Sequence, residues 1–176
     1  MPLKIHNSDI FSQKSGLIIL PIDGISPNHE GTLGRNFIKL FPESWKSVSQ
    51  KVNYPIPLGK IFCCECKEPD SFEFVALASM LNHTSSNAPS SYKSIVYEIT
   101  KQTVSYTINN KIARVATPIL SGGWRLNIDE AFLAMIDGYE KVRLSGKLLK
   151  LEIFELNEDK FNRIKNLANS MGFEFK

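Results

Sequence analysis

The run Gly16-Leu17-Ile18-Ile19-Leu20-Pro21-Ile22-Asp23 constrains the fold most, because it is almost continuously apolar and leads into a turn-rich stretch. Such a run is typical of a β-strand that is buried on both of its faces. Strands of that kind belong mostly to parallel sheets that helices cover on both sides. The run therefore predicts an α/β protein in which residues 16–23 form a central strand.

Segments of strand and helix character alternate along the rest of the chain. Further strands are predicted over residues 3–7, 60–66, 72–80, 112–120 and 148–154. Helices are predicted where apolar residues recur at helical spacing, over residues 33–41, 92–106, 128–142 and 157–171. This order predicts a single domain over residues 1–176, a three-layer α-β-α sandwich with a mixed, mainly parallel central sheet. A ligand crevice is then expected beyond the carboxyl ends of the strands.

The charge and hydropathy pattern argues against nucleic acid and membranes as partners. The 176 residues include 21 basic and 18 acidic side chains, which gives a net charge of +3 without any long run of like charge. This balance indicates no strong nucleic-acid patch. No apolar run approaches the roughly 20 residues of a membrane helix, and the first residues lack the apolar core of a signal peptide. We therefore expect a cytoplasmic protein with no membrane partner.

The three cysteines, Cys63, Cys64 and Cys66, all fall at the end of one predicted strand. An odd, local group of cysteines is not a disulfide framework. A zinc site would need a second pair of ligands, and a redox pair would stand at the start of a helix. We expect these side chains to be structural, and we expect no metal ion and no cofactor.

Two glycine-containing loops each follow a predicted strand and precede a predicted helix. The first is Glu30-Gly31-Thr32-Leu33-Gly34-Arg35, and the second is the end of Ala116–Gly123. Glycine lets the backbone approach a ligand closely, and the start of a helix favours an anion. The first loop taken alone is equally an ordinary turn. Asn127 and Glu130 form a capping-box pattern after the second loop. Two such loops predict one diphosphate held from both sides.

At these residues the chain resembles the macro domain family. Members of that family end a late strand with a proline, an aliphatic pair and a Ser-Thr-Gly-like loop, to which Pro118–Gly123 is similar, and Glu130-Ala131 also fits. They carry Gly-Asp-Ile after the first strand, where this chain has Ser8-Asp9-Ile10. The similarity covers residues 3–154. It implies a macro-like fold that binds ADP-ribose or a related adenine nucleotide, either free or attached to protein or nucleic acid.

The resemblance also implies roles for individual residues. Asp9 would accept a hydrogen bond from the adenine amino group, and the backbone N–H of Ile10 would donate to the ring. The alternative for Asp9 is a turn aspartate. Trp124 stands where family members often place an aromatic side chain on the distal ribose, although packing beneath the loop is an alternative. The remaining implied ligand contacts come from the two loops: Gly31, Thr32, Leu33, Gly34, Ser121, Gly122 and Gly123.

Several departures separate this chain from the hydrolases of the family. Those enzymes usually carry Asn-x-Ala-Asn after the second strand, where this chain has Leu20–Asp23, and many place an aspartate where this chain has Leu33. Another branch uses a lysine and an aspartate at places that correspond here to 80–84 and to Trp124-Arg125. The family's water-activating groups are therefore missing from their expected positions.

Three titratable residues near the first loop leave the question of catalysis open. Asp23, His29 and Glu30 combine carboxylates with an imidazole, which is chemistry suited to orienting a water molecule. Loop residues of these types are, however, mostly solvated. Three functions remain: a nucleotide-binding module, an ADP-ribosyl hydrolase with relocated acid and base groups, or a macro-fold regulatory or interaction domain that binds no nucleotide.

Overall fold

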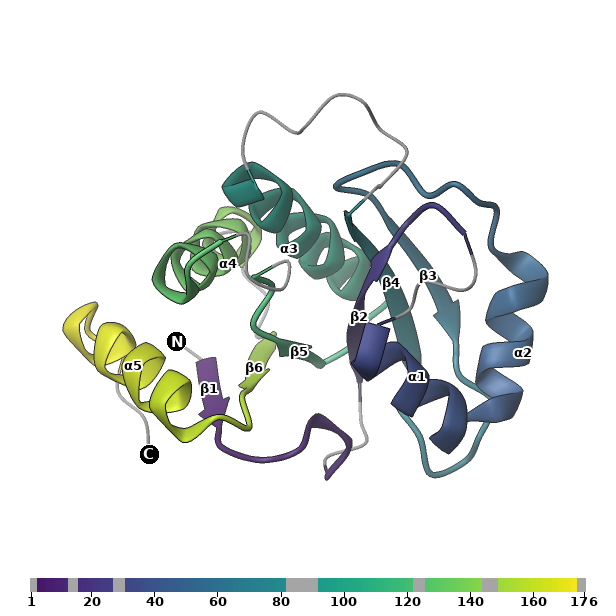
Figure 1. The fold of residues 1–176 in the computed structure, drawn as a ribbon, viewed down its shortest axis with the longest axis horizontal. Helices are drawn as coiled ribbons and strands as arrows, with labels where there is room; N and C mark the ends of the chain where they lie inside the picture. The colour runs from purple at the N-terminus through teal and green to yellow at the C-terminus, as the bar shows by residue number, and fades with distance from the viewer. Residues whose placement is uncertain are drawn as a thin grey trace.

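The computed structural model describes residues 3–12, 16–26, 31–81, 92–121, 126–143 and 149–173. These residues form strands and helices in an alternating order (Figure 1). The strands are β1 (Leu3–His6), β2 (Leu17–Asp23), β3 (Ile61–Glu65), β4 (Phe74–Leu81), β5 (Arg114–Pro118) and β6 (Lys150–Phe154). The helices are the short 3-10 helix η1 (Ile10–Ser12) and the α-helices α1 (Gly31–Leu40), α2 (Pro42–Lys51), α3 (Tyr92–Asn109), α4 (Ile128–Arg143) and α5 (Glu158–Ser170).

The strands form one mixed sheet in the order β1-β6-β5-β2-β4-β3. Every neighbouring pair is parallel except β3 and β4, which pair antiparallel. Strand β2 lies in the interior of the sheet, and its residues Leu17, Ile18, Ile19 and Leu20 are completely buried. The expected mixed, mainly parallel sheet with a central strand at 16–23 is therefore confirmed.

Two apolar cores lie on opposite faces of the sheet, because successive side chains of a strand point to opposite faces. One core joins Leu17 and Ile19 of β2 to buried side chains of α3, α4 and α5. The other joins Ile18 and Leu20 to η1, α1 and α2, through side chains that include Phe37. Figure 1 shows α1 and α2 at one end of the molecule and α5 at the other. The result is the predicted three-layer sandwich.

The segment between β2 and β3 differs from the prediction in two ways. Helix α1 begins at Gly31, so that Gly31–Gly34 are its first turn and not a loop before it. A second helix, α2, begins at Pro42, where the sequence predicted only the end of a helix. Proline is favoured in the first turn of a helix, because its missing N–H would have no helical partner there and its φ already suits the helix.

Two predicted helix starts are confirmed. The side chain of Asn127 accepts a hydrogen bond from the backbone N–H of Glu130 at 2.9 Å, which caps α4. The side chain of Asn157 does the same for the N–H of Lys160, at 2.9 Å, which caps α5. Helix α4 also packs closely on α3, since a Cβ on Gly138 would come within 2.6 Å of the carbonyl oxygen of Tyr97.

The cysteines occupy structural positions on β3 and just after it. Cys64 is buried, and Cys63 and Cys66 are partly buried. Burial raises the pKa of both the Cys63 and the Cys66 thiol to about 12, so neither is a thiolate at neutral pH. In the part of the chain that the structure describes, no group of histidine, cysteine and acidic side chains could hold a metal ion. None of the described helices is long and apolar enough to cross a membrane.

Candidate functional site

The carboxyl ends of four parallel strands meet at one edge of the sheet. Residues 7–12 follow β1 and are here called the Asp9 segment; Asp23 ends β2, Ser121 follows β5, and Glu155 follows β6. Ligands of open α/β sheets bind in the crevice beyond such strand ends. This edge therefore contains the candidate site, and it brings together the ends of elements that are far apart in the sequence.

The Asp9 segment is held in a tight turn by its own hydrogen bonds. Oδ1 of Asp9 accepts from the backbone N–H of Phe11 at 3.0 Å, and the carbonyl oxygen of Asp9 accepts from the hydroxyl of Ser12 at 2.6 Å. Asp9 itself is exposed, whereas Ile10 and Phe11 are buried. A carboxylate has sites for about four hydrogen bonds. Asp9 is thus fixed in place by one contact and has acceptor capacity beyond it.

Two hydrogen bonds from the side chain of Asn7, here called the Asn7 clasp, join this segment to the residues that follow β6. The side-chain amide of Asn7 donates to the carbonyl oxygen of Glu155 at 2.9 Å and to that of Leu156 at 3.3 Å. The side chain of Leu156 is 71% exposed. Sequence reasoning missed both Asn7 and Leu156, because only the pairing of β1 with β6 places them together.

The first turn of α1, residues 31–34, follows the carboxyl end of β2 in the chain. Gly31 has a φ of +67°, and a Cβ there would meet nothing within 4 Å. Gly31 and Thr32 are exposed, Leu33 is half-buried, and Gly34 is buried. The first four N–H groups of a helix have no intrahelical partner, and the helix dipole places positive charge beside them. No acidic residue lies in this turn. The turn is therefore suited to an anion.

Strand β2 ends in a buried carboxylate. Asp23 is 6% exposed, and its Oδ1 accepts a hydrogen bond from the backbone N–H of Ile25 at 3.2 Å. The register between β2 and β4 shifts at Ile22 and Asp23. Directly after it, a Cβ on Gly24 would come within 2.2 Å of the hydroxyl oxygen of Ser79. Asp23 is therefore held rigidly at the strand end.

A pocket of ≈ 390 Å³ opens between α4 and α5, next to the ends of β5 and β6. This volume lies within the range of about 300–1,000 Å³ for small-molecule sites. Its lining combines aliphatic with polar and charged residues: Ile119, Ser121, Leu126, Ile128, Glu155, Asp159, Lys160 and Arg163. The α5 contribution has no signal in the sequence, because it depends on how the last helix packs.

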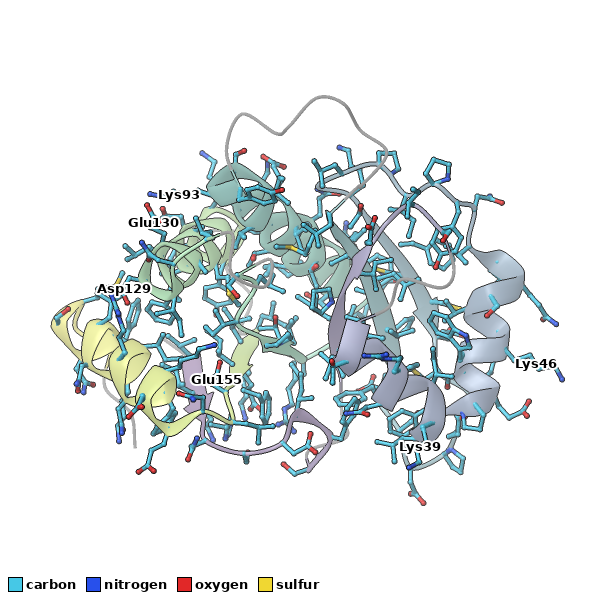
Figure 2. All side chains as sticks on the ribbon, viewed as in Figure 1. Lys39, Lys46, Lys93, Asp129, Glu130 and Glu155 are labelled. Carbon is cyan, nitrogen blue, oxygen red and sulfur yellow. The ribbon has the colours of Figure 1, made fainter. Side chains whose placement is uncertain are left out.

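An ion pair ties the two helices of this pocket together. The guanidinium of Arg163 on α5 donates two hydrogen bonds of 2.7 Å to the carboxylate of Asp129 on α4. These contacts lower the pKa of Asp129. Figure 2 shows Asp129 beside α5, and Glu155 at the other end of that helix. The bidentate pair fixes the orientation of α5 on α4.

Several predicted site residues cannot be placed. His29, Glu30, Gly122, Gly123 and Trp124 lie outside the described residues. Ser121 precedes the second of these gaps, and its carbonyl oxygen accepts from the backbone N–H of Leu126 at 3.2 Å. Asp9, Ile10, Asp23, Ser121 and the first turn of α1 do lie at strand ends on one edge of the sheet, as expected. Their roles toward a ligand remain predictions.

These features define an α/β protein with a pocket beside the carboxyl ends of β5 and β6. No family model matches the sequence, and no curated protein is detectably similar to it in sequence. Solved structures identify the fold more closely. The macrodomain of Mycobacterium tuberculosis DarG matches with a TM-score of 0.66 at 13% identity, over 86% of this chain and 96% of that one.

Two further structures are similar at comparable coverage. A variant of the Oceanobacillus iheyensis macrodomain with ADPR matches with a TM-score of 0.69 at 12% identity, over 96% of this chain and 92% of that one. The macro domain of ganglioside induced differentiation associated protein 2 reaches 0.76 at 10% identity, over 94% and 82% of the two chains. The chain therefore has the macrodomain fold, in a form that is highly divergent in sequence.

Proposed function

We propose that this chain binds ADP-ribose or a related adenine nucleotide in the crevice at the carboxyl ends of β1, β6, β5 and β2. The fold is that of macrodomains, one of which has been solved with ADPR. The observation that carries the proposal is Asp9: its carboxylate is exposed at this edge and anchored through one oxygen by the N–H of Phe11. An anchored acceptor is what recognition of an adenine amino group requires.

The diphosphate is assigned to the first turn of α1 together with the loop that follows β5. The first turn offers backbone N–H groups and the positive end of the helix dipole, with no acidic side chain in it to compete for them. The exposed Leu156 and the aliphatic residues that line the pocket offer apolar surface near the ends of β5 and β6, where the nucleoside would lie. In this arrangement the base lies toward β1 and the phosphates lie toward β2.

The test compares Asp9→Asn and Asp9→Ala with the parent protein by calorimetry. Asparagine keeps an oxygen that accepts from Phe11, but it replaces the second oxygen with a donor that opposes the adenine amine. An unpaired buried donor costs about 1–3 kcal/mol, so the affinity for ADP-ribose should fall roughly 5- to 150-fold in both variants. Ribose 5-phosphate, which lacks the base, should bind equally to all three proteins.

Two outcomes would contradict parts of this proposal. If no heat is measured with the parent at millimolar ADP-ribose, the chain is a macro-fold protein without this nucleotide function. If Asp9→Asn binds ADP-ribose as tightly as the parent, the crevice holds phosphate but the adenine assignment is wrong. Equal thermal stability of Asp9→Asn and the parent shows that the turn of the Asp9 segment is intact.

Hydrolysis of ADP-ribosylated substrates is the second candidate function, and one observation favours it. Asp23 places a buried carboxylate at the end of β2, beside the crevice assigned to the ligand. A carboxylate within hydrogen-bond reach of a bound water molecule can act as a general base. If the chain is a hydrolase that uses Asp23, then Asp23→Asn should abolish the release of ADP-ribose from modified protein or nucleic acid while ADP-ribose still binds. Turnover that survives Asp23→Asn would exclude this role.

A further inference from the structure

Three polar side chains form a cluster beneath the Asp9 segment: His6 on β1, Glu152 on β6 and Arg114 on β5. Oε2 of Glu152 lies 3.5 Å from Nε2 of His6, and the guanidinium of Arg114 donates a hydrogen bond to the same oxygen. Glu152 is only 3% exposed. A buried carboxylate needs a charged partner, and Arg114 provides it.

The imidazole of His6 stacks on a neighbouring aromatic ring, and its Nε2 atom has no hydrogen-bond partner among the described residues. Its ring lies on that of Phe154, with centroids 4.6 Å apart and an interplanar angle of 14°. Nε2 is buried and makes no hydrogen bond to any described residue. The carboxylate of Glu152 is farther away than the roughly 2.7–2.9 Å of a charge-assisted hydrogen bond. A movement of less than about 1 Å would therefore form one.

The charges around His6 favour its neutral form. Burial lowers the pKa of His6 most strongly, Glu152 raises it, and the neighbouring cations Lys4 and Arg114 lower it, with a net decrease from the ordinary value of 6.5. These groups come from each of the three strands at this end of the sheet, β1, β5 and β6. At neutral pH the ring is therefore uncharged, and it gains a proton only in mild acid.

His6 is coupled to the candidate nucleotide site through Phe154 and the backbone. Phe154 belongs to the same apolar core as Ile10 and Phe11, the buried residues of the Asp9 segment. The carbonyl oxygen of His6 accepts from the backbone N–H of Glu155 at 3.0 Å, one residue before the clasp made by Asn7. His6 therefore contacts, through its ring and through its backbone, residues that pack against the Asp9 segment and residues next to the hydrogen bonds of Asn7.

We propose that His6 is a proton-sensitive positioning residue for the Asp9 segment. The neutral ring stacks on Phe154 and holds the segment in the arrangement described above. Protonation puts an N–H on Nε2 facing Glu152, and the imidazolium moves toward that carboxylate and away from its place on Phe154. The Asp9 segment then shifts, and the nucleotide binds more weakly. This inference rests on the proposed function and adds a pH dependence to it.

Calorimetry with ADP-ribose between a pH of about 7.5 and about 5 tests it, since the lowered pKa of His6 lies below the ordinary histidine value of about 6.5 and the window must extend well below that value. The dissociation constant of the parent should rise roughly 5-fold or more on acidification, which is the usual size of coupling between two sites. Phenylalanine can stack but cannot gain a proton, so the dissociation constant of His6→Phe should not change with pH in this window. Equal pH dependence in His6→Phe and the parent would overturn the inference.

His83→Phe is the control, because His83 lies in no segment that is assigned to the ligand. This variant should keep the pH dependence of the parent. If the dependence disappears in His83→Phe and persists in His6→Phe, a different histidine is responsible and the inference is wrong.

A measurement without ligand separates this inference from the proposed function. In NMR spectra of the free protein, the amide signals of residues 9–12 should titrate with the same midpoint as the ring protons of His6. Those signals should not titrate in this window in His6→Phe. If ADP-ribose does not bind at all, the proposed function fails and the titration still decides the coupling. Amide signals that ignore the His6 midpoint, or that titrate equally in His6→Phe, would overturn the coupling itself.

Discussion

Helices α1 and α2 have the same length and follow one another on the same face of the sheet. They differ in the negative charge at their first turns. Glu68, on the connection between β3 and β4, covers the start of α2: its carboxylate accepts from the backbone N–H of Glu43 at 2.8 Å and from that of Ser44 at 3.2 Å. The hydroxyl of Ser44 donates to it as well. No acidic residue lies in the first turn of α1.

Under the proposed function, the difference separates a helix start that the protein caps itself from one that a ligand would contact. Both turns present N–H groups and the positive end of a dipole, which favour negative charge. In α2 the protein supplies that charge itself, from a residue 24 positions away in the sequence. In α1 the first turn has glycine at two of its four positions and is exposed at Gly31 and Thr32. We infer that the diphosphate of the proposed ligand supplies the negative charge at the start of α1.

The largest expected effect comes from giving α1 a carboxylate of its own. Thr32→Glu places a negative charge in the first turn, where it should stabilise the helix by about 0.3–1 kcal/mol. The same charge would face the diphosphate, and like charges in contact cost several kcal/mol, so the affinity for ADP-ribose should fall by about 100-fold or more. Calorimetry and thermal unfolding measure the two effects on the same sample.

Thr32→Gln is the control for this variant, because glutamine has the shape of glutamate without its charge. It should bind ADP-ribose far more tightly than Thr32→Glu does. If the two variants lose affinity equally, crowding and not charge is responsible, and the proposed anion site at α1 is refuted.

The next effect in size concerns the start of α2. Glu68→Ala removes the acceptor for three donors, and loss of a helix cap costs about 0.5–2 kcal/mol of unfolding free energy. Denaturant titration should show this loss, while the affinity for ADP-ribose stays that of the parent. Glu65→Ala removes an exposed carboxylate from β3, and it should change the stability by no more than about 0.5 kcal/mol. A reduced nucleotide affinity in Glu68→Ala would contradict the inference that the start of α2 is structural and only the start of α1 contacts the ligand.

An effect of similar size on stability is expected at Gly31. Its φ of +67° is one that alanine adopts at a cost of about 1–2 kcal/mol, although a Cβ there would meet no other atom within 4 Å. Gly172, with a φ of +81° and equally open space, provides a matched position at the end of α5. Gly31→Ala and Gly172→Ala should lower the melting temperature similarly, and only Gly31→Ala should weaken ADP-ribose binding. Equal affinities would show that the conformation of Gly31 is not part of the site.

The smallest effect is the pH dependence of the contact that caps α2. Burial raises the pKa of Glu68, but hydrogen bonds from the Ser44 hydroxyl and from the backbone of Ser44 and Glu43 outweigh it and lower the pKa below its usual value. A lowered pKa in the folded state means that the contact stabilises the protein above the unfolded pKa of about 4.3 and is lost as the pH falls below it. The parent should lose more stability than Glu68→Gln over that range.

The strands and most helices were predictable because their information is local. The apolar run of β2 and the caps at Asn127 and Asn157 can be read within a few residues of sequence, and the structure confirms them. The start of α2 was missed for a physical reason. Its cap is Glu68, which lies beyond the following strand, and Phe41 at the N-cap position makes no side-chain hydrogen bond.

The residues of the candidate site also differ in whether local sequence could predict them. Asp9 and the glycines of α1 stand in short motifs, so sequence reasoning selected them. Asn7, Leu156 and Arg163 belong to no motif, and their place at the crevice depends on the pairing of β1 with β6 and on the docking of α5 against α4. Contacts between residues more than 30 positions apart cannot be derived from local periodicity.

The pairing of β1 with β6 has a consequence for synthesis on the ribosome. The clasp from Asn7 to Glu155 joins residues 148 positions apart, so the base side of the crevice stays incomplete while almost the whole sequence is translated. At about 5–20 residues per second, this delay amounts to roughly 7–30 seconds. During that time β1 has no partner strand, and its first residues are available to chaperones. The pairing of β1 is therefore completed only after β6 has been translated.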